Sequence, residues 1–474
     1  MSVSTEKKKV KKAPKTKAVK ASKKEKIQVI EISRDTLTKT LKTANDFIMK
    51  KGTLPVLSTV RLEFTIKECI IAATDLEVSW SKRVKVLKGA VVARCVPADL
   101  LIREIQALPQ DIVKVELAFS PDTVKINDRC TIWTMSADDF PVLPDIKGKD
   151  IEIDNITDSL KKVIVAIGGS DTRYTLNGVC FNFADKMIVG TDGHRLHTET
   201  LNFKGDVNSQ IIIPEKACKA IIKYPHKYEH DRDDWRSKEK EVKGMWETKT
   251  YTLNVFGNEV KVEYKADKKA EDIDITYSGP VNASGEHKGY VGHYSLTHSK
   301  HETIQDYLQK QAEEMYLDYH NPMPVRLSAD IKHISCTLAG GTMTAKLIDG
   351  TYPDVKKIIP KSQPVKVDFN AKEFLEVMAG VMPVLRDSKG VKLTVNGKID
   401  IQGMNPGTAD YKWSVDAKSS GKGKDKTLIV GMNAQYIIDA VRAYGESGTV
   451  TMELSEELSP CLINKKAVIM PMRV

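Results

Sequence analysis

No stretch of the 474-residue chain approaches the roughly 18 consecutive apolar residues that a membrane-spanning helix requires. The N-terminus also lacks the apolar core of a signal peptide. Cysteine is sparse: the chain has seven, they are scattered, and no two form a C-x-x-C pair. These absences exclude a membrane protein and predict a soluble protein with reduced thiols in a cytosol-like compartment.

Nucleotide-binding and nucleophile signatures are missing as well. The sequence contains no Walker A spacing, no G-x-G-x-x-G and no G-x-S-x-G. Gly421 and Gly423 lie in a polar, lysine-rich segment that lacks the spacing of a phosphate-binding loop. We therefore expect neither an ATPase nor a dinucleotide-dependent enzyme, and no cofactor.

The net charge of +10 is concentrated at the N-terminus. Residues 1–26 hold eleven lysines and two glutamates, so residues 27–474 carry 62 basic and 61 acidic side chains, a net of +1. A body that held DNA mainly by neutralising phosphates would carry an excess of Lys and Arg. We expect a disordered tail at residues 1–26, serving solubility or non-specific attraction to nucleic acid, and DNA contact confined to one surface of the body.

One type of segment occurs three times along the chain: an amphipathic helix, two strands, a second helix and closing strands. The first helices are predicted from apolar stripes in residues 33–50, from Thr157 onward and from Asn370 onward. The second helices are predicted to begin at Pro97, at Pro214 and at Asn433. In the first of these, the predicted apolar stripe is Leu100, Leu101 and Ile105. Three copies of one α+β unit therefore account for most of the chain.

The second repeat contains an insertion that the other two lack. Residues 226–321 hold twelve of the chain's thirty aromatic residues, whereas a disordered linker is poor in aromatics. We expect a folded module that includes a hairpin of residues 250–255 and 259–264 and a helix over residues 302–316.

Two groups of residues could carry chemistry. The T-D-G-H segment at residues 191–194 offers the Asp192 carboxylate and the His194 imidazole to hydrolysis or to a metal. The first repeat has residues 74–77 (TDLE) and the third has residues 403–405 (GMN) at the matching position, which indicates a shared turn. The insertion also contains four histidines, His287, His293, His298 and His301, and the last two have a one-turn spacing that could bind a metal. No cysteine and no further ligand on a regular element accompanies them, so we expect surface side chains and no metal site.

Seven segments together resemble the bacterial DNA polymerase III β subunit, the DNA sliding clamp. They are LPVLSTVRLEF (residues 54–64), ATDLEVS (73–79), FPVLPDI (140–146), RYTLNG (173–178), TDGHRL (191–196), DGTYPDVKKIIP (349–360) and VIMPMRV (468–474). They follow the family's order along all three repeats, cover most of the chain outside the tail and the insertion, and are jointly specific.

The resemblance implies a DNA clamp fold, with two helices packed on antiparallel sheets in each domain. Two chains would associate head to tail into a six-domain ring around duplex DNA, with edge strands of the first domain pairing with the partner's third domain. We expect clamp domains at residues 27–150, 151–360 and 361–474, with the insertion at about 226–321 in the second.

In such a ring the repeated helices line the hole, and their basic side chains attract phosphates without reading sequence. The residues predicted to face DNA are Lys39, Lys42, Lys50, Lys51, Arg103, Lys161, Lys162, Lys216, Lys219, Lys223, Lys372 and Arg442.

The resemblance also implies a cleft between the second and third domains that binds short peptides of polymerases, the clamp loader and repair proteins. Met and Leu surfaces suit an apolar anchor, and Arg and backbone groups suit its orientation. The matching residues are Leu176, Thr191, Gly193, His194, Arg195, Leu196, Pro353, Ile358, Val468, Met470, Pro471, Met472 and Arg473. Two positions depart from the family, since Lys357 replaces a common Arg and Val474 a usual Leu.

The predicted function is that of a non-enzymatic processivity factor that encircles DNA and tethers the replicative polymerase. It would act in the cytoplasm at the nucleoid, or in the host cytoplasm if the gene is viral. Two alternatives stand beside it: a metal-dependent DNA-processing enzyme that uses Asp192 and His194, and a dedicated scaffold created by the insertion.

Overall fold

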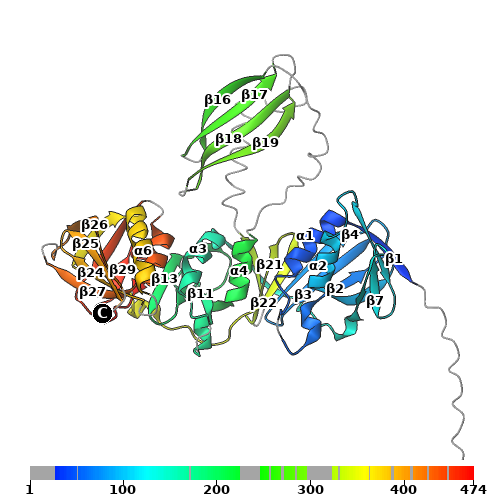
Figure 1. Ribbon diagram of the computed structural model, residues 1–474, viewed down its shortest axis with the longest axis horizontal. Coiled ribbons are helices and arrows are strands. Elements are labelled where there is room, and N and C mark those ends of the chain that lie inside the picture. The colour runs from blue at the N-terminus through cyan, green and yellow to red at the C-terminus, as the bar shows by residue number, and fades with distance from the viewer. Residues whose placement is uncertain are drawn as a thin grey trace, which may run out of the picture. The chain divides into compact units, whose positions relative to one another are not determined.

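The computed structural model describes residues 27–50, 52–169, 172–224, 246–255, 258–267, 272–282, 285–295, 323–328, 331–361, 363–385, 389–405, 409–423, 426–445 and 448–473. The predictions for the N-terminal tail, for Lys51, for the helix over 302–316 and for His298 and His301 lie outside these residues. The chain divides into a unit of Met1–Ala72 with Arg83–Phe140 and a unit of Ala73–Lys82 with Pro141–Val474 (Figure 1). Among the described helices, none has the length and apolar content to span a membrane.

The predicted repeat is present three times, each copy with the same order of two helices and eight strands. The first copy consists of β1 (Gln28–Ser33), α1 (Arg34–Ala44), β2 (Thr59–Phe64), β3 (Glu68–Thr74), β4 (Val78–Lys85), β5 (Val92–Pro97), α2 (Ala98–Gln106), β6 (Lys114–Phe119), β7 (Thr123–Ile126) and β8 (Cys130–Trp133). The second consists of β10 (Gly148–Ile153), α3 (Ile156–Val163), β11 (Gly178–Asn182), β12 (Met187–Thr191), β13 (Arg195–Thr200), β15 (Gln210–Pro214), α4 (Glu215–Lys223), β20 (Met323–Ser328), β21 (His333–Leu338) and β22 (Gly341–Lys346). The third consists of β23 (Val365–Asn370), α6 (Ala371–Leu385), β24 (Gly390–Val395), β25 (Lys398–Asn405), β26 (Ala409–Ser420), β27 (Leu428–Asn433), α7 (Ala434–Tyr444), β28 (Thr449–Leu454), β29 (Cys461–Ile463) and β30 (Ala467–Ile469).

Each repeat arranges its strands in the same two antiparallel orders. The first strand of the repeat joins the three closing strands, as β1-β6-β7-β8, β10-β20-β21-β22 and β23-β28-β29-β30. The other four strands give β4-β3-β2-β5, β13-β12-β11-β15 and β26-β25-β24-β27. Short added strands lie beside these, β9 (Met135–Ser136) in the first repeat and β14 (Phe203–Lys204) in the second.

The helices of each repeat form where the sequence predicts them, and they pack in pairs: α1 beside α2, α3 beside α4 and α6 beside α7. Ser33 caps α1 by accepting a hydrogen bond from the Thr36 amide, and Asn433 caps α7 through the amides of Gln435 and Tyr436. The α1 helix ends at Ala44, so it is shorter than the predicted 33–50.

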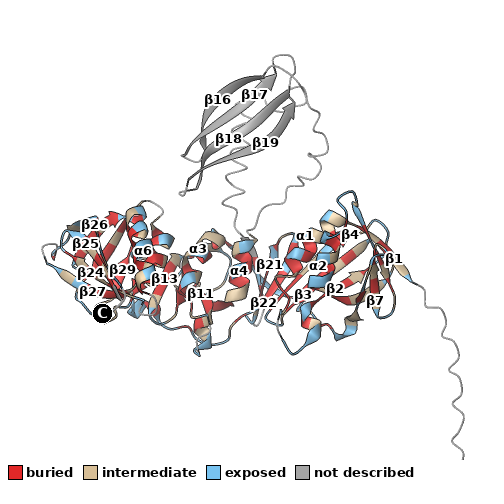
Figure 2. Cartoon of the chain, in the orientation of Figure 1, coloured by how far each residue is buried: buried red, intermediate tan, exposed pale blue. Residues whose placement is uncertain are grey.

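The predicted apolar stripes are mostly confirmed, because their residues form the core (Figure 2). Leu37 and Leu41 of α1 are fully buried, and so are Phe374, Met378 and Val381 of α6. The prediction for α2 was wrong at one position. Leu101 and Ile105 are buried with Ala98, at helical spacing, whereas Leu100 lies off this stripe and is 49% exposed.

The insertion contains the predicted hairpin and extends beyond it. Strands β16 (Trp246–Val255) and β17 (Asn258–Asp267) pair in antiparallel register, with Val255 opposite Asn258 at the turn. Two further strands, β18 (Asp272–Asn282) and β19 (Gly285–Ser295), complete a four-stranded sheet. Neither strand was predicted, because Gly279 and Pro280 in β18 and the glycines of β19 are typical of loops.

Candidate partner-binding site at the β12–β13 turn

Two segments from distant parts of the sequence meet where β13 pairs with β30. Leu196 lies opposite Val468 and Arg195 opposite Ile469 in antiparallel register. Beyond the strand, the Met470 amide donates a hydrogen bond of 2.9 Å to the His194 carbonyl. The predicted site segments around residues 191–196 and 468–473 are therefore brought together.

The turn between β12 and β13 is fixed by the side chains of Thr191 and Asp192. Thr191 Oγ1 accepts from the Gly193 amide at 3.0 Å and donates to the Arg195 carbonyl at 2.6 Å. Asp192 Oδ1 accepts from the amides of His194 and Arg195 at 2.8 and 2.9 Å. Gly193 adopts a φ of +87°, which glycine reaches without steric cost. The turn is thus preorganised, with His194 exposed at its tip.

The first repeat contains the same turn at the matching position. Thr74 Oγ1 accepts from the Leu76 amide and donates to the Val78 carbonyl, and Asp75 Oδ1 accepts from the amides of Glu77 and Val78. Leu76 takes the place of Gly193 at a φ of +79°. The hypothesis of a shared turn is confirmed for these two repeats. It was wrong for the third, because residues 403–405 belong to strand β25.

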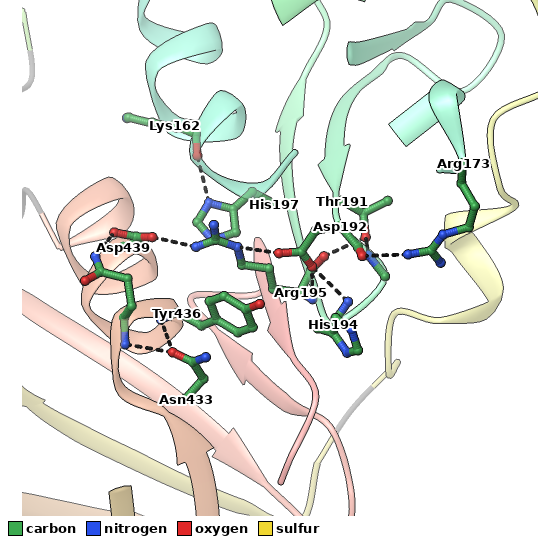
Figure 3. Close-up of polar contacts among 12 residues, drawn as sticks. Lys162, Arg173, Thr191, Asp192, His194, Arg195, His197, Asn433, Tyr436 and Asp439 are labelled. Carbon is green, nitrogen blue, oxygen red and sulfur yellow. Dashed lines mark hydrogen bonds and ion pairs between the residues drawn. The ribbon is translucent and has the colours of Figure 1, made fainter. Parts of the chain in front are cut away.

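Arg195 connects this turn to α7 of the third repeat (Figure 3). Its guanidinium forms ion pairs with Asp192 and Asp439, and it stacks over the ring of Tyr436 at 4.3 Å from the centroid. Gln435 donates a further hydrogen bond to Asp439 at 2.7 Å. Because the three charged side chains are largely buried, removal of one would leave an uncompensated charge, which is costly.

The Asp192 carboxylate is therefore occupied by hydrogen bonds that hold the turn together. One carboxylate oxygen accepts two backbone amides, and the other accepts from Arg195 Nε at 3.1 Å. Arg173 holds the same residue from the other side by donating to its carbonyl at 3.0 Å (Figure 3). Across the described residues, His, Cys, Asp and Glu side chains form no group of three or more that could hold a metal ion.

The predicted site residues separate into a buried set and an exposed set. Leu176, Leu196 and Val468 are buried in one apolar cluster with Tyr352 and Val355. Thr191 is also buried, and Arg195, Pro471 and Met472 are half-buried. The exposed members are Gly193, His194, Pro353, Ile358, Met470 and Arg473.

Met470 is 40% exposed, so its side chain is available to a partner. The main chain beyond β30 is anchored again at Met472, whose amide donates to the Gly431 carbonyl at 2.9 Å.

Several residues of this region were not predicted. Tyr352 supports the turn, because its hydroxyl accepts from the Thr191 amide at 3.0 Å. Tyr352 and Arg173 lie inside segments that the sequence analysis quoted, so a signal was present. The sequence contains no signal for Asp439 and Tyr436, because both occupy ordinary positions on the surface of α7.

A cavity of about 320 Å³ adjoins the apolar cluster on the side away from the turn. It is lined by Met187, Lys356, Ile359, Pro360, Lys361, Leu462 and Lys465, none of which was predicted. Leu462 belongs to the apolar cluster, and Met187 and Ile359 pack against it, so the cavity is adjacent to the cluster.

The residues predicted to face DNA, apart from Lys50 and Lys51, lie on the six helices. Lys39, Lys161 and Lys219 form ion pairs with acids of their own helices, and Lys216 pairs with Asp75 of the first repeat's turn. The remaining predicted positions on described elements are exposed or half-buried: Lys42, Lys50, Arg103, Lys162, Lys223, Lys372 and Arg442.

His197 is buried beside the Arg195 cluster. Its Nδ1 donates to the Lys162 carbonyl in α3 at 2.7 Å, and its ring lies 5.4 Å from that of Tyr444 (Figure 3). Burial lowers the pKa of this imidazole to about 4. The side chain is therefore neutral in the folded chain near neutral pH.

The fold and this site define a class of protein built from three repeats of two helices on two sheets, joined by strand pairing between repeats. Models of the DNA polymerase III beta subunit match all three: the N-terminal domain at residues 29–144, the central domain at 150–231 and the C-terminal domain at 356–473. The chain belongs to the DNA polymerase III beta subunit family.

Relatives and solved structures agree with this assignment. Proteins named beta sliding clamp from Haemophilus influenzae and Pseudomonas aeruginosa are 22% and 23% identical, over 94% of this chain and 99% of their own lengths. The structure of the DNA polymerase sliding clamp from Pseudomonas aeruginosa has a TM-score of 0.66 at 20% identity, covering 94% of this chain and 100% of that one. That of the beta subunit from Thermotoga maritima has a TM-score of 0.65 at 19% identity, with the same coverage.

The pKa of His197 predicts a specific acid sensitivity. In the unfolded chain His197 takes up a proton below about pH 6.5, whereas in the folded chain it does so only near pH 4. Between these two pH values the unfolded chain binds more protons, so the free energy of unfolding falls as the pH falls from 6.5 to 4. In His197→Asn, whose amide can still donate to Lys162, the unfolding free energy should fall between pH 7.5 and 5 by about 2 kcal/mol less than in the wild type. Urea unfolding at the two pH values measures this, and equal losses in both proteins would contradict it.

Proposed function

We propose that this chain is a DNA sliding clamp, a processivity factor that encircles duplex DNA as a ring of two chains and tethers the replicative polymerase. The proposal rests mainly on how successive repeats join. The closing strand of each repeat pairs with a strand of the repeat before it, which leaves the edges of β8 and β26 available for a second chain. Family membership supports the same function.

The joining rule is the same at both connections within the chain. The last strand of the second repeat, β22, pairs with Val78–Ser81 of β4, and the last strand of the third, β30, pairs with β13. In each case the closing strand of one repeat adds to the fourth strand of the repeat before it. The closing strand of the first repeat, β8, is the end of its sheet among the described strands. The fourth strand of the third repeat, β26, pairs along residues 409–416 with β25 and with no other described strand.

Two copies satisfy both edges at once if β8 of each chain pairs with β26 of the other. Such a contact is made twice, closes on itself and pairs both of these edges. Each of these edges carries a large apolar side chain in solvent, since Trp133 of β8 is 75% exposed and Trp413 of β26 is 58% exposed. Aromatic side chains of this kind are typical of the buried centres of interfaces.

The clamp domains follow the repeats. We place the start of the second at β10, whose first residue, Gly148, precedes the predicted boundary at 151. The third begins with β23 at Val365, after the predicted 361. The insertion at about 226–321 belongs to the second domain.

DNA would be held by the closed ring and by the basic helix positions, including Lys42, Arg103, Lys372 and Arg442. Because residues 27–474 have a net charge of only +1, electrostatic attraction alone is weak, and the ring supplies the lasting hold. The chain would act in the cytoplasm and catalyse no reaction. The alternative of a metal-dependent enzyme at Asp192 and His194 has no support, since the turn itself uses the Asp192 carboxylate.

Partners would bind the site at the β12–β13 turn. An extended peptide from a polymerase, the clamp loader or a repair protein would place an apolar side chain over the floor of Leu176, Leu196 and Val468. Met470, Met472 and Ile358 would flank it as adaptable apolar walls, and His194 and Arg473 would contact its polar groups.

The dimer is tested at the two tryptophans. Trp133→Glu or Trp413→Glu should each weaken both interfaces of the ring by about 2 kcal/mol or more, because a charge would replace a buried aromatic anchor. Size-exclusion chromatography with light scattering should then show monomers at concentrations where the wild type is dimeric. The control is Ile66→Glu, an equally exposed apolar position between β2 and β3, which should remain dimeric. Dimers of unchanged stability in both tryptophan variants would contradict the proposed edges.

The partner site is tested at Met470, because truncation of Leu196 or Val468 would also disturb the core. Met470→Ala should weaken the binding of a polymerase-derived peptide by about 1 to 2 kcal/mol, the usual cost of removing one wall of an anchor pocket. Fluorescence anisotropy of the labelled peptide measures the change, with Leu458→Ala, exposed in the turn after β28, as the matched control. An unchanged affinity in Met470→Ala and Met472→Ala together would remove the site from this position.

A further inference from the structure

The second unit contains a second copy of the partner-site geometry, at the place where β22 pairs with β4. In the turn, Thr74 and Leu76 correspond to Thr191 and Gly193. The strand registers extend this correspondence: Ala345 lies opposite Val78 as Ile469 lies opposite Arg195. Counting from these pairs, Ser79 and Thr344 occupy the positions of Leu196 and Val468, and Lys346 occupies that of Met470.

A hollow of about 80 Å³ lies at this equivalent position, and all of its lining residues belong to the second unit. One wall is the turn with Leu76 and Ser79, another is the segment of residues 141–144, and a third is the β21–β22 pair. The volume is sufficient for one small side chain. The segment of residues 141–144 is part of the FPVLPDI motif, which the partner site does not use.

The floor of this hollow is polar where the partner site is apolar. Ser79 and Thr344 are both buried, and Ser79 Oγ donates to the Thr344 carbonyl at 3.4 Å. At the rim, Lys346 replaces a methionine, and His333 lies directly opposite Lys346 across the β21–β22 pair. Cross-strand neighbours share one face of a sheet, so an ammonium group and an imidazole are presented together. This combination favours a carboxylate.

Two apolar side chains at the rim are held in solvent. Val142 is 93% exposed, and Leu76 is 54% exposed at a φ of +79°. A leucine in this conformation is strained, whereas the second repeat has Gly193 there at +87°. The fold gains little burial from Leu76 in return, so the strained side chain points to a function at the rim.

We propose that this hollow is a second peptide-binding site, selective for an extended acidic segment. Its occupant would place one small apolar side chain between Leu76 and Val142 and a carboxylate at Lys346 and His333. Glu77 lies next to Lys346, because its carbonyl accepts a hydrogen bond from the Lys346 amide at 2.8 Å, so the occupant's carboxylate would approach Lys346 from the side of His333. The inference rests on the proposed function, because it assigns to the turn at Thr74 the kind of peptide binding that is proposed for the turn at Thr191.

The test uses a library of random 12-residue peptides on phage, selected against the full chain with Met470→Ala and Met472→Ala so that the partner site is weakened. Peptides with Asp or Glu next to a small apolar residue should be enriched. Synthetic copies should bind at least tenfold more weakly when Lys346→Glu is added. Lys147→Glu makes the same charge change at an exposed position outside the hollow and should alter affinity less than twofold.

Leu76→Gly separates binding from folding. Because glycine relieves the strained φ, the midpoint of thermal unfolding should rise, while affinity for the selected peptides falls at least fivefold. Selection of no peptide that depends on Lys346, equal losses in Lys346→Glu and Lys147→Glu, or full affinity in Leu76→Gly would each overturn the proposal.

A polymerase-derived peptide, measured in parallel on the wild type, distinguishes the two proposals. If it binds and depends on Met470 while no Lys346-dependent peptide is found, only the second site fails. If it does not bind at all, the proposed function fails whatever the library yields.

Discussion

The closing strand of one repeat pairs with the fourth strand of the repeat before it, and this pairing positions the candidate site. At β13 and β30 this pairing places the main chain of Met470 against His194 and brings α7 within reach of Arg195. The turn supplies Asp192, the helix supplies Asp439, and the arginine between them is satisfied only when both repeats are folded and joined. The candidate site is therefore formed only where the second and third repeats join.

The same rule accounts for the ring. A repeat that joins head to tail leaves one edge at each end of the chain, here β8 and β26. A second chain removes both edges symmetrically. A ring also explains why a body with almost no net charge suits a DNA-binding role, because a closed ring holds a duplex without strong phosphate contacts. In the proposed ring, the basic residues on the helices would need only to keep the duplex centred and free to slide.

The sequence predicted the repeats well, because amphipathic helices and short strands carry local periodic signals. It failed where burial depends on long-range contacts. Leu100 has the same character as Leu101, and only packing on the sheet separates them. Strands β18 and β19 were hidden by glycine and proline, whose loop preference the sheet overrides.

The candidate site shows the same division between local and long-range signals. Leu196 and Val468 were predicted as site residues, and both are buried, because the sequence does not show whether an apolar residue is exposed or packed in a core. Asp439 and Tyr436 acquire their contacts with Arg195 only through the joining of two repeats, so no local pattern marked them. The turn at Thr191 was predictable, because threonine, aspartate and glycine fix such a turn through their own side chains and conformations.

The central claim is that the protein holds DNA by enclosing it. The most direct measurement loads the purified dimer onto nicked circular DNA with a clamp-loading ATPase and then follows retention at high salt before and after the circle is cut. A protein that encloses DNA is expected to stay on the circle in high salt and to be lost rapidly once the DNA is linear, because free ends let a ring slide off. Equal retention on circular and linear DNA, falling on both as salt rises, would show simple electrostatic binding and contradict it.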